Sequence, residues 1–380
     1  MTRHSLLVVS AFAAALLGAP IAEAADPIRI GVPVIFSGPG AFVGESEKKV
    51  LDLQVEVLNA KGGIAGRPVE LLYYDTEGKP DVAVRMFNRL IKNDKVAAIL
   101  GPTASWEALP VKPIVEQSGI PTIMLASTRA IVEPVGKCVF KTPPDDRIVV
   151  AKLYEHLKAA GLTRLAIVTS QDGFGDGGRA ELVAQAGPAG LSIVFDEKYS
   201  MEDADLSPLL NKIKRTDAQA VVNWSSSRAP ILMTVNYRNI GLTLPLYQSH
   251  AAISEAYLKG TAANSEGVMA AGAKLDAADD LLASDPQYQA IHDFKSAFKA
   301  KYNQNPTHFG AGAYDAFNML SAAIAKVGTD PAKLCAALET VKDHRGVSGV
   351  FNYSASDHGG LGKDSVVMYK ASGGAWKMAK

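Results

Sequence analysis

The alternation of short apolar stretches with helical patterns constrains the fold of this chain more than any other feature of its sequence. Apolar stretches at residues 28–36, 67–75, 96–101 and 120–127 are separated by segments whose apolar residues recur every three to four positions. The last two stretches, VAAILG and IPTIMLAS, have the composition typical of strands in a parallel sheet covered on both faces. This series predicts an α/β domain.

A second series of the same kind follows the segment KCVFKTPPDD. Its predicted strands are RLAIVTS, LSIVFDEKY, AQAVVNWS and LPLYQSH, again with helical segments between them. Three further helical segments and a turn-rich end with predicted strands, residues 351–378, complete the chain. Two such series in 380 residues predict two α/β domains side by side.

The first residues indicate export. A basic start is followed by an apolar stretch from Leu6 to Leu17 and by an A-x-A pattern at residues 22–24. The apolar stretch is shorter than the roughly 20 residues that a membrane-spanning helix needs. We therefore predict a secretory signal peptide at residues 1–24, cleaved after Ala24.

The composition bears on two questions, nucleic-acid binding and disulfide pairing. The sequence has 39 basic and 39 acidic residues, a balance that gives no support for nucleic-acid binding. Its two cysteines, Cys138 and Cys335, lie far apart in the sequence. Export permits a disulfide, but sequence separation alone leaves their pairing open.

No motif predicts catalysis, a metal site or a cofactor. The segment GFGDGG, residues 173–178, lacks the register of a dinucleotide-binding loop, so we interpret it as a tight turn that starts a helix. Tyr154 and Lys158 have a dehydrogenase-like spacing but lie on a helix that is mostly polar. The sequence has no H-E-x-x-H pattern and no G-x-S-x-G pattern, and its carboxylates form no evident catalytic pair.

Small hydroxyl residues follow two consecutive strands. Ser105 comes after VAAILG, and Ala126, Ser127 and Thr128 end the next apolar stretch. Ligands of open α/β sheets bind beyond the carboxyl ends of strands, and helix N-termini bind anions. The pair of strand ends therefore predicts a cradle for a carboxylate, with ordinary helix N-capping as the alternative.

Several stretches resemble the solute-binding proteins of ABC importers, in the branched-chain amino-acid (leucine/isoleucine/valine-binding) family. They are IRIGVPVIFSGPGAFVGESEKKVLDLQVEVLNAKGGIAGRPVELLYYD, AAILGPTAS, GIPTIMLAST, RLAIVTSQDGFG and GAGAYDAF. The resemblance implies a periplasmic protein of the type I periplasmic-binding fold: two α/β lobes, each a parallel sheet flanked by helices, joined by three crossovers. It also implies hinge closure on a ligand in the cleft, no catalysis, and an inner-membrane ABC permease as partner. We expect a monomer.

The resemblance also implies a division of the chain and a set of ligand contacts. Lobe one is expected at residues 25–140 and 252–346, and lobe two at 141–251 and 347–380. Ser105 and Thr128 are expected to hold the ligand carboxylate, with the Ala126 backbone beside them. The remaining candidates for the cleft are Phe42 or Val43, Trp106, Phe174, Trp224, Ser226, Arg228 and His250.

One departure from the family pattern bears on the ligand. The resemblance implies an acid after the last strand of lobe two, paired with the ammonium group of an amino acid. The corresponding segment LPLYQSHAAIS contains His250 and no acid before Glu255. An ammonium group buried without a partner would be costly, so we expect an aromatic or short aliphatic acid. The alternatives are a branched-chain amino acid, an amide or urea-like solute, a ligand sensor of the same fold, and an exported enzyme.

Overall fold

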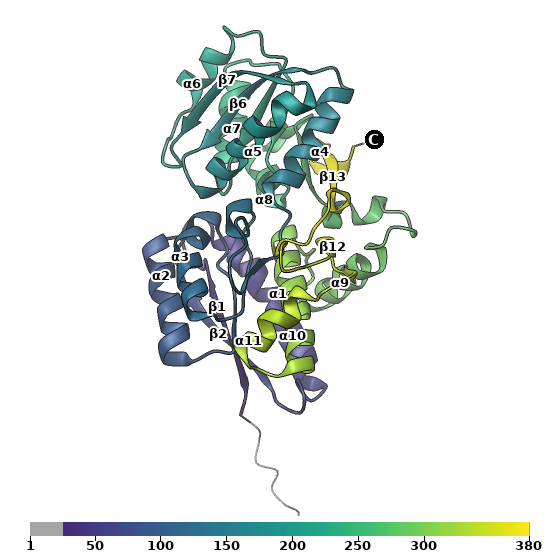
Figure 1. Cartoon of the computed structure of the whole chain (residues 1–380). Coiled ribbons are helices and arrows are strands. Elements are labelled where there is room, and N and C mark those ends of the chain that lie inside the picture. The colour runs from purple at the N-terminus through teal and green to yellow at the C-terminus, as the bar shows by residue number, and fades with distance from the viewer. Residues whose placement is uncertain (1–25, 380) are drawn as a thin grey trace, which may run out of the picture.

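The chain forms two α/β lobes, one above the other in Figure 1, and crosses between them through loop segments. The computed structural model describes residues 26–379. The expected signal peptide, residues 1–24, lies outside this range. No helix within the range is both long and apolar enough to cross a membrane.

Lobe one is built on a parallel sheet with the strand order β2-β1-β3-β4-β5. Its strands are β1 (Ile28–Val34), β2 (Val69–Asp75), β3 (Ala98–Leu100), β4 (Thr122–Met124) and β5 (Val139–Lys141). Its helices are α1 (Ala41–Ala60), α2 (Pro80–Arg89), α3 (Ser105–Ser118), α9 (Tyr288–Tyr302), α10 (His308–Val327) and α11 (Pro331–Glu339). A short hairpin of β11 (His344–Arg345) and β12 (Val350–Phe351) belongs to the same lobe.

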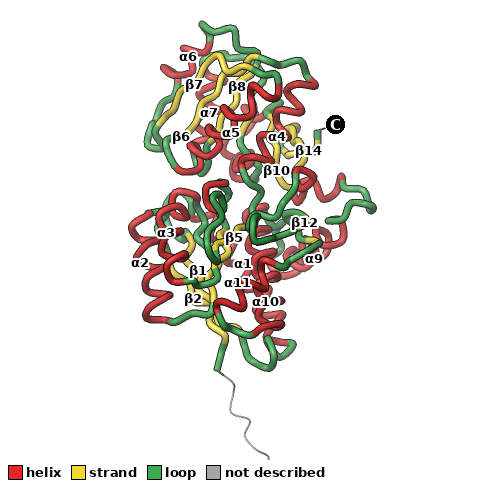
Figure 2. The backbone as a smooth tube through the Cα atoms, viewed as in Figure 1, coloured by secondary structure: helices red, strands yellow, loops and turns green. Residues whose placement is uncertain are grey.

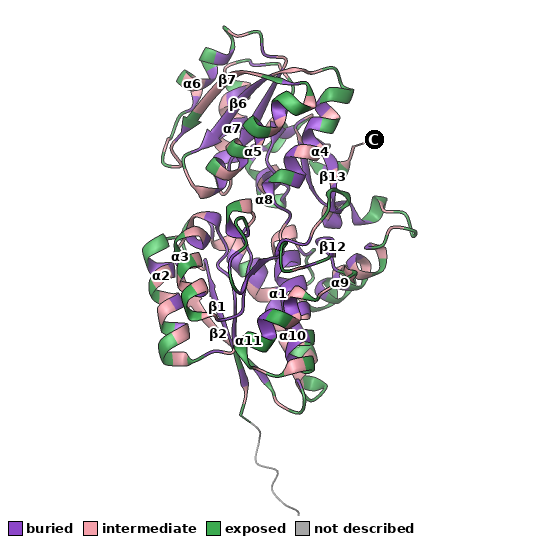
Figure 3. Cartoon of the chain, viewed as in Figure 1, coloured by how far each residue is buried: buried purple, intermediate pink, exposed green. Residues whose placement is uncertain are grey.

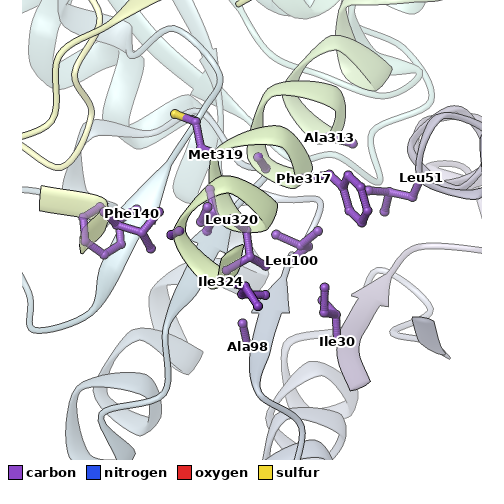
Figure 4. Close-up of a cluster of buried hydrophobic side chains, with 14 of the residues drawn as sticks. Ile30, Leu51, Ala98, Leu100, Phe140, Ala313, Phe317, Met319, Leu320 and Ile324 are labelled. Carbon is purple, nitrogen blue, oxygen red and sulfur yellow. The ribbon is translucent and has the colours of Figure 1, made fainter. Parts of the chain in front are cut away.

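Segments from both ends of the sequence share the core of lobe one. Helix α10, yellow-green in Figure 1, packs beside the purple helix α1. Figure 4 shows Phe317 of α10 beside Leu51 of α1, and Ile324 near Ala98 of β3. The core of lobe one is therefore complete only when α10 and α11 pack on the sheet formed by β1 to β5.

Lobe two has a larger sheet with the order β14-β13-β10-β9-β8-β6-β7. Its strands are β6 (Arg164–Ser170), β7 (Ser192–Tyr199), β8 (Ala220–Trp224), β9 (Leu246–Gln248), β10 (Met269–Ala273), β13 (Val366–Ser372) and β14 (Ala375–Met378). Its helices are α4 (Asp146–Ala159), α5 (Gly173–Ala189), α6 (Ser207–Ile213), α7 (Ala229–Asn239) and α8 (Glu255–Thr261). The strands from β6 to β10 are parallel, whereas β13 and β14 are antiparallel additions at one edge.

The arrangement confirms the predicted two-lobed fold class, in which helices cover both faces of each sheet. In Figure 3 the strands are largely purple, the colour of buried residues, while the outer helix faces carry most of the green, exposed residues. Figure 2 shows that loops, in green, make up much of the chain between the lobes.

The observed crossings differ from the expected boundaries at residues 251/252 and 346/347. The chain passes between the lobes after β5, after β10 and before β13. Strand β10 pairs with β9 and β13, so residues 252–273 belong with lobe two rather than lobe one. Phe351 and Tyr353 pack in the core of lobe one, so the third crossing comes after them rather than near Val347.

A disulfide ties two distant parts of lobe one. Cys138, just before β5, is bonded to Cys335 of α11, with their Cα atoms 5.2 Å apart and 197 residues of sequence separation. Both residues are buried. The structure thus answers the question of pairing that the sequence left open.

Candidate functional site

A hollow lies between the lobes at the carboxyl ends of their strands, with about 880 Å³ of empty space when its open mouth is included. Lobe one contributes Val43, Thr103, Ala104, Ser105, Trp106 and Ser127 to its lining. Lobe two contributes Phe174, Ser226, Ser227 and His250. Asp276, His308, Phe309 and Ser348 line it from the segments near the crossings.

Ser105 is the first residue of α3, and its hydroxyl sits at the floor of this hollow. The N-cap position of α3 belongs to Ala104, which has no side-chain acceptor, so Ser105 is not an N-cap residue. Its Oγ accepts a hydrogen bond from the Thr128 backbone N–H at 3.2 Å. Its own hydroxyl proton, and the first N–H groups of α3, are therefore available to an anion.

Two buried acids hold the loop before Ser105. Thr103 donates its hydroxyl proton to Glu47 Oε2 at 2.6 Å and accepts from the Ile35 N–H at 3.3 Å. Glu107 Oε2 accepts from the Ala104 N–H at 3.3 Å. Burial raises the pKa of Glu47 well above its usual range and that of Glu107 to about 7. Because its only proton goes to Glu47, Thr103 lines the hollow without a donor to offer.

Thr128 and Ala126 lie close to this floor but do not line it. Thr128 is fully buried, and a Cβ atom placed on Gly177 of α5 would lie 2.1 Å from its Oγ1. The Thr128 side chain therefore faces lobe two, while its N–H supports Ser105. Ala126 is part of a core cluster, and Ser127 is the residue of this segment that faces the hollow.

Aromatic rings form one wall. The ring centroids of Phe174 and His250 are 5.2 Å apart, and Trp224 stands 6.1 Å from Phe174 and 5.7 Å from His250. Trp224 is fully buried and lies behind the other two, which line the hollow themselves. Trp106 also lines it, and its Nε1 donates to the Gly78 carbonyl at 2.9 Å.

The other candidates are divided between the hollow and its surroundings. Phe42 packs against Phe309 at 5.7 Å and lines a neighbouring groove, so Val43 and Phe309 face the hollow instead. Ser226 lines the hollow, and its Oγ has no hydrogen-bond partner among the described residues. Arg228 lines neighbouring grooves at the mouth.

Among the polar side chains that line the hollow are four of which the sequence identified only one. They are His250, Asp276, His308 and Ser348, which we call the polar cluster. His308 Nδ1 lies 3.6 Å from Asp276 Oδ2. Burial, followed by the charges of His308 and Lys141, lowers the pKa of His250 to about 3, so its ring is neutral. The sequence offered a signal for His308, which begins the helical stretch HFGAGAYDAF, but none for Asp276, which follows the unrecognised strand β10.

The described residues contain no group of three or more histidine, cysteine or acidic side chains positioned to hold a metal ion. The polar cluster is accordingly a set of hydrogen-bonding groups that face a ligand-sized space.

Comparisons with known proteins agree with this architecture. A family model described as periplasmic binding protein matches residues 27–375. Among curated proteins, Leu/Ile/Val-binding protein homolog 3 of Brucella melitensis is 27% identical over 96% of each chain. The leucine-, isoleucine-, valine-, threonine- and alanine-binding protein of Pseudomonas aeruginosa is 28% identical over 83% of each chain.

Solved structures show the same fold. An extracellular ligand-binding receptor from Rhodopseudomonas palustris HaA2 superposes with a TM-score of 0.86 at 25% identity, over 93% of this chain and 99% of that one. A solute-binding protein of an ABC transporter from R. palustris, in complex with benzoate, superposes with a TM-score of 0.81 at 21% identity, over 93% and 95% of the two chains.

Proposed function

This chain belongs to the periplasmic binding protein family, and from that premise we propose that it binds a small carboxylic acid between its lobes and delivers it to an inner-membrane ABC permease. Its curated relatives are Leu/Ile/Val-binding proteins, as the sequence predicted. The family match confirms the prediction of a binding protein rather than an enzyme. What this chain binds depends on the side chains of its own hollow.

The observation that carries the proposal is the pairing of Ser105, at the start of α3, with aromatic walls. A hydroxyl donor and the first N–H groups of a helix suit a carboxylate. Phe174, Trp106 and Phe309 offer flat apolar surfaces within the same hollow. An aromatic acid satisfies both features, and the benzoate complex of R. palustris shows that the fold has room for one.

A neutral histidine in the wall strengthens the choice. His250 occupies the region where the family resemblance implied an acid, and its pKa of about 3 leaves it uncharged at neutral pH. A neutral ring adds no negative charge for an ammonium group. We therefore favour a carboxylic acid without an amine.

A branched-chain amino acid is the second candidate, and Asp276 is the observation that favours it. Among the described residues that line the hollow, Asp276 is the one acid. An ammonium group could approach its carboxylate, although His308 already stands 3.6 Å from Oδ2.

A ligand panel separates the candidates. The purified protein, refolded to remove carried-over ligand, is screened by thermal shift and then calorimetry against benzoate, phenylpyruvate, leucine, valine and acetamide. Ligand at a hundred times its Kd stabilises the fold by about 2.7 kcal/mol, which a melting curve detects. We expect stabilisation by the aromatic acids and little by leucine or valine.

Two controls define the outcome. Ser105→Ala should raise the Kd for the acid about tenfold or more, because a hydrogen bond to a charged group is lost. Ser118→Ala, at the exposed far end of α3, should leave it unchanged. Micromolar binding of leucine, with the aromatic acids inert, would replace this proposal by the amino-acid one.

A further inference from the structure

The polar cluster contains more hydrogen-bonding capacity than the protein uses. Both ring nitrogens of His250, both of His308, Asp276 Oδ2 and Ser348 Oγ are buried without a hydrogen-bond partner among the described residues. His250 and Ser348 are 6% and 1% exposed. Buried polar atoms left unpaired are costly, so this concentration of them beside a hollow indicates a place where a ligand supplies the partner.

The four side chains reach the hollow from distant segments of the chain. His250 follows β9, Asp276 follows β10, His308 begins α10, and Ser348 lies between β11 and β12. Asp315 of α10 fixes the backbone of that last segment by accepting from the Ser348 N–H at 2.7 Å. The positions of the four side chains are therefore set by several elements of the fold and not by a single loop.

The chemistry of the cluster restricts the group that can bind there. The Asp276 carboxylate only accepts hydrogen bonds, whereas a neutral imidazole has one donor and one acceptor nitrogen, and the Ser348 hydroxyl does both. A second carboxylate would be repelled by Asp276, and an apolar group would leave every one of these atoms unpaired. A hydroxyl group can donate to Asp276 and accept from an imidazole N–H or the Ser348 hydroxyl, whereas the ammonium group of an amino acid can only donate.

The polar cluster and Ser105 line the same hollow. A Cβ atom placed on Gly173 would lie 3.4 Å from the Ser105 carbonyl carbon, so the start of α5 packs on the floor of the hollow. The next residue, Phe174, has its ring 5.2 Å from that of His250. One aromatic wall thus runs from the carboxylate end to the polar cluster.

We propose that the polar cluster selects a hydroxylated aromatic acid, with Asp276 as the residue that receives the hydroxyl proton. This inference rests on the proposed function and names its ligand class. The carboxylate lies at Ser105, the ring lies along Phe174, and the hydroxyl reaches Asp276 and the neighbouring imidazoles.

Calorimetry with three matched probes tests the proposal: benzoate, 3-hydroxybenzoate and 4-hydroxybenzoate. We expect at least one hydroxybenzoate to bind the wild-type protein about tenfold or more tightly than benzoate, the gain of one charge-assisted hydrogen bond. Asp276→Asn should bring that ratio toward one. Asp279→Asn should keep the wild-type ratio, because Asp279 is an exposed residue of the short 3₁₀ helix Lys274–Asp280 that also carries Asp276.

The outcomes are distinct. If benzoate binds and neither hydroxyl group improves its affinity, the inference is wrong while the proposed function stands, and this wild-type measurement decides even if Asp276→Asn fails to fold. A ratio in Asp276→Asn equal to that of the wild-type protein also overturns the role of Asp276. If no aromatic acid binds and leucine does, the proposed function fails and the inference fails with it.

Discussion

Asp315 shows how one buried acid shapes the hollow without entering it. It is fully buried in α10, and its two oxygens accept from the N–H groups of Val347 and Ser348 at 2.8 and 2.7 Å. Burial raises its pKa to about 7, although the two backbone hydrogen bonds oppose the shift. The position of Ser348 in the polar cluster therefore depends on a side chain whose charge state changes near neutral pH.

This residue should make stability depend on pH. The folded-state pKa of Asp315, about 7, lies above the roughly 3.9 expected in the unfolded chain. Folding then favours the protonated form, so its contribution to stability is complete at acid pH and is lost as the pH rises to about 7. We expect the melting temperature of the wild-type protein, relative to that of Asp315→Asn, to fall between about pH 4 and pH 7 and to change little above that.

The difference in melting temperature between the two proteins is followed across pH. Any effect of the substitution that does not depend on pH therefore does not influence the result. Asp343→Asn, at an exposed position of the same lobe, provides the control and should keep a constant offset from the wild-type protein. A constant offset for Asp315→Asn as well would contradict the expected titration.

At the scale of elements, α5 explains the glycine-rich segment at residues 173–178, which the sequence analysis interpreted as the start of a helix and not as a nucleotide-binding loop. Asp172 caps the helix by accepting from the N–H groups of Phe174 and Gly175, as a turn that starts a helix requires. Gly173 and Gly177 lie one turn apart on the face that meets lobe one. The absence of side chains there lets the two lobes approach each other closely.

Gly177→Ala should therefore weaken ligand binding. Its new Cβ would lie 2.1 Å from Thr128 Oγ1 and 2.8 Å from Asp146 Oδ2, so the lobes must separate slightly or these groups must shift. We expect the Kd to rise several-fold, measured by calorimetry, while the melting temperature without ligand changes little. Gly187→Ala in the same helix meets nothing within 4 Å and is the matched control. Equal affinities for the two variants would show that the close contact does not govern closure.

The sequence predicted most elements but missed strand β10, which decides the lobe boundary. Periodicity and apolar runs identified β1, β6, β8 and the long helices, because these segments are rich in branched apolar residues or carry a clear stripe. Strand β10 has the sequence MAAGA, whose small residues give no β signal, and only its partners β9 and β13 define it. Missing β10 also concealed Asp276, which follows it.

Only those residues of the site that lie in recognisable local sequence patterns could be predicted. Ser105, which lines the hollow, was predicted because it starts a helix after a strand, whereas Phe174, which also lines it, was predicted only from the family resemblance. The direction of the Thr128 side chain depends on packing between the lobes, and the place of Trp224 behind His250 depends on packing within lobe two. His308 and Ser348 come from segments more than 50 residues beyond His250, and no local pattern places them beside it.

For the whole molecule, the contact between the lobes includes a charge pair as well as the glycine face. Arg129 of lobe one donates to Glu181 of α5 at 2.9 Å and also pairs with Glu133. The lobes in this structure are thus closed against each other beside the hollow. Pairs of this kind that remain partly exposed contribute little by themselves, so ligand contacts rather than this pair should decide whether closure persists.

The disulfide is expected to stabilise the whole molecule through lobe one. Because Cys138 and Cys335 have a sequence separation of 197, the bond restricts a very long loop in the unfolded chain. The double variant Cys138→Ala and Cys335→Ala should lose about 2–4 kcal/mol of unfolding free energy in urea titrations. Reducing agent should lower the stability of the wild-type protein and leave that of the variant unchanged. Equal urea midpoints for oxidised wild-type protein and variant would contradict the expectation.

The same bond has a consequence for proteolysis. The contiguous part of lobe two, residues 146–273, lies entirely inside the covalent ring that the disulfide closes. A single cut anywhere in that part leaves both pieces of the chain attached to each other, and both remain anchored in lobe one. A nicked molecule therefore stays in one piece until the disulfide is reduced, so a cut in lobe two would not by itself release a fragment.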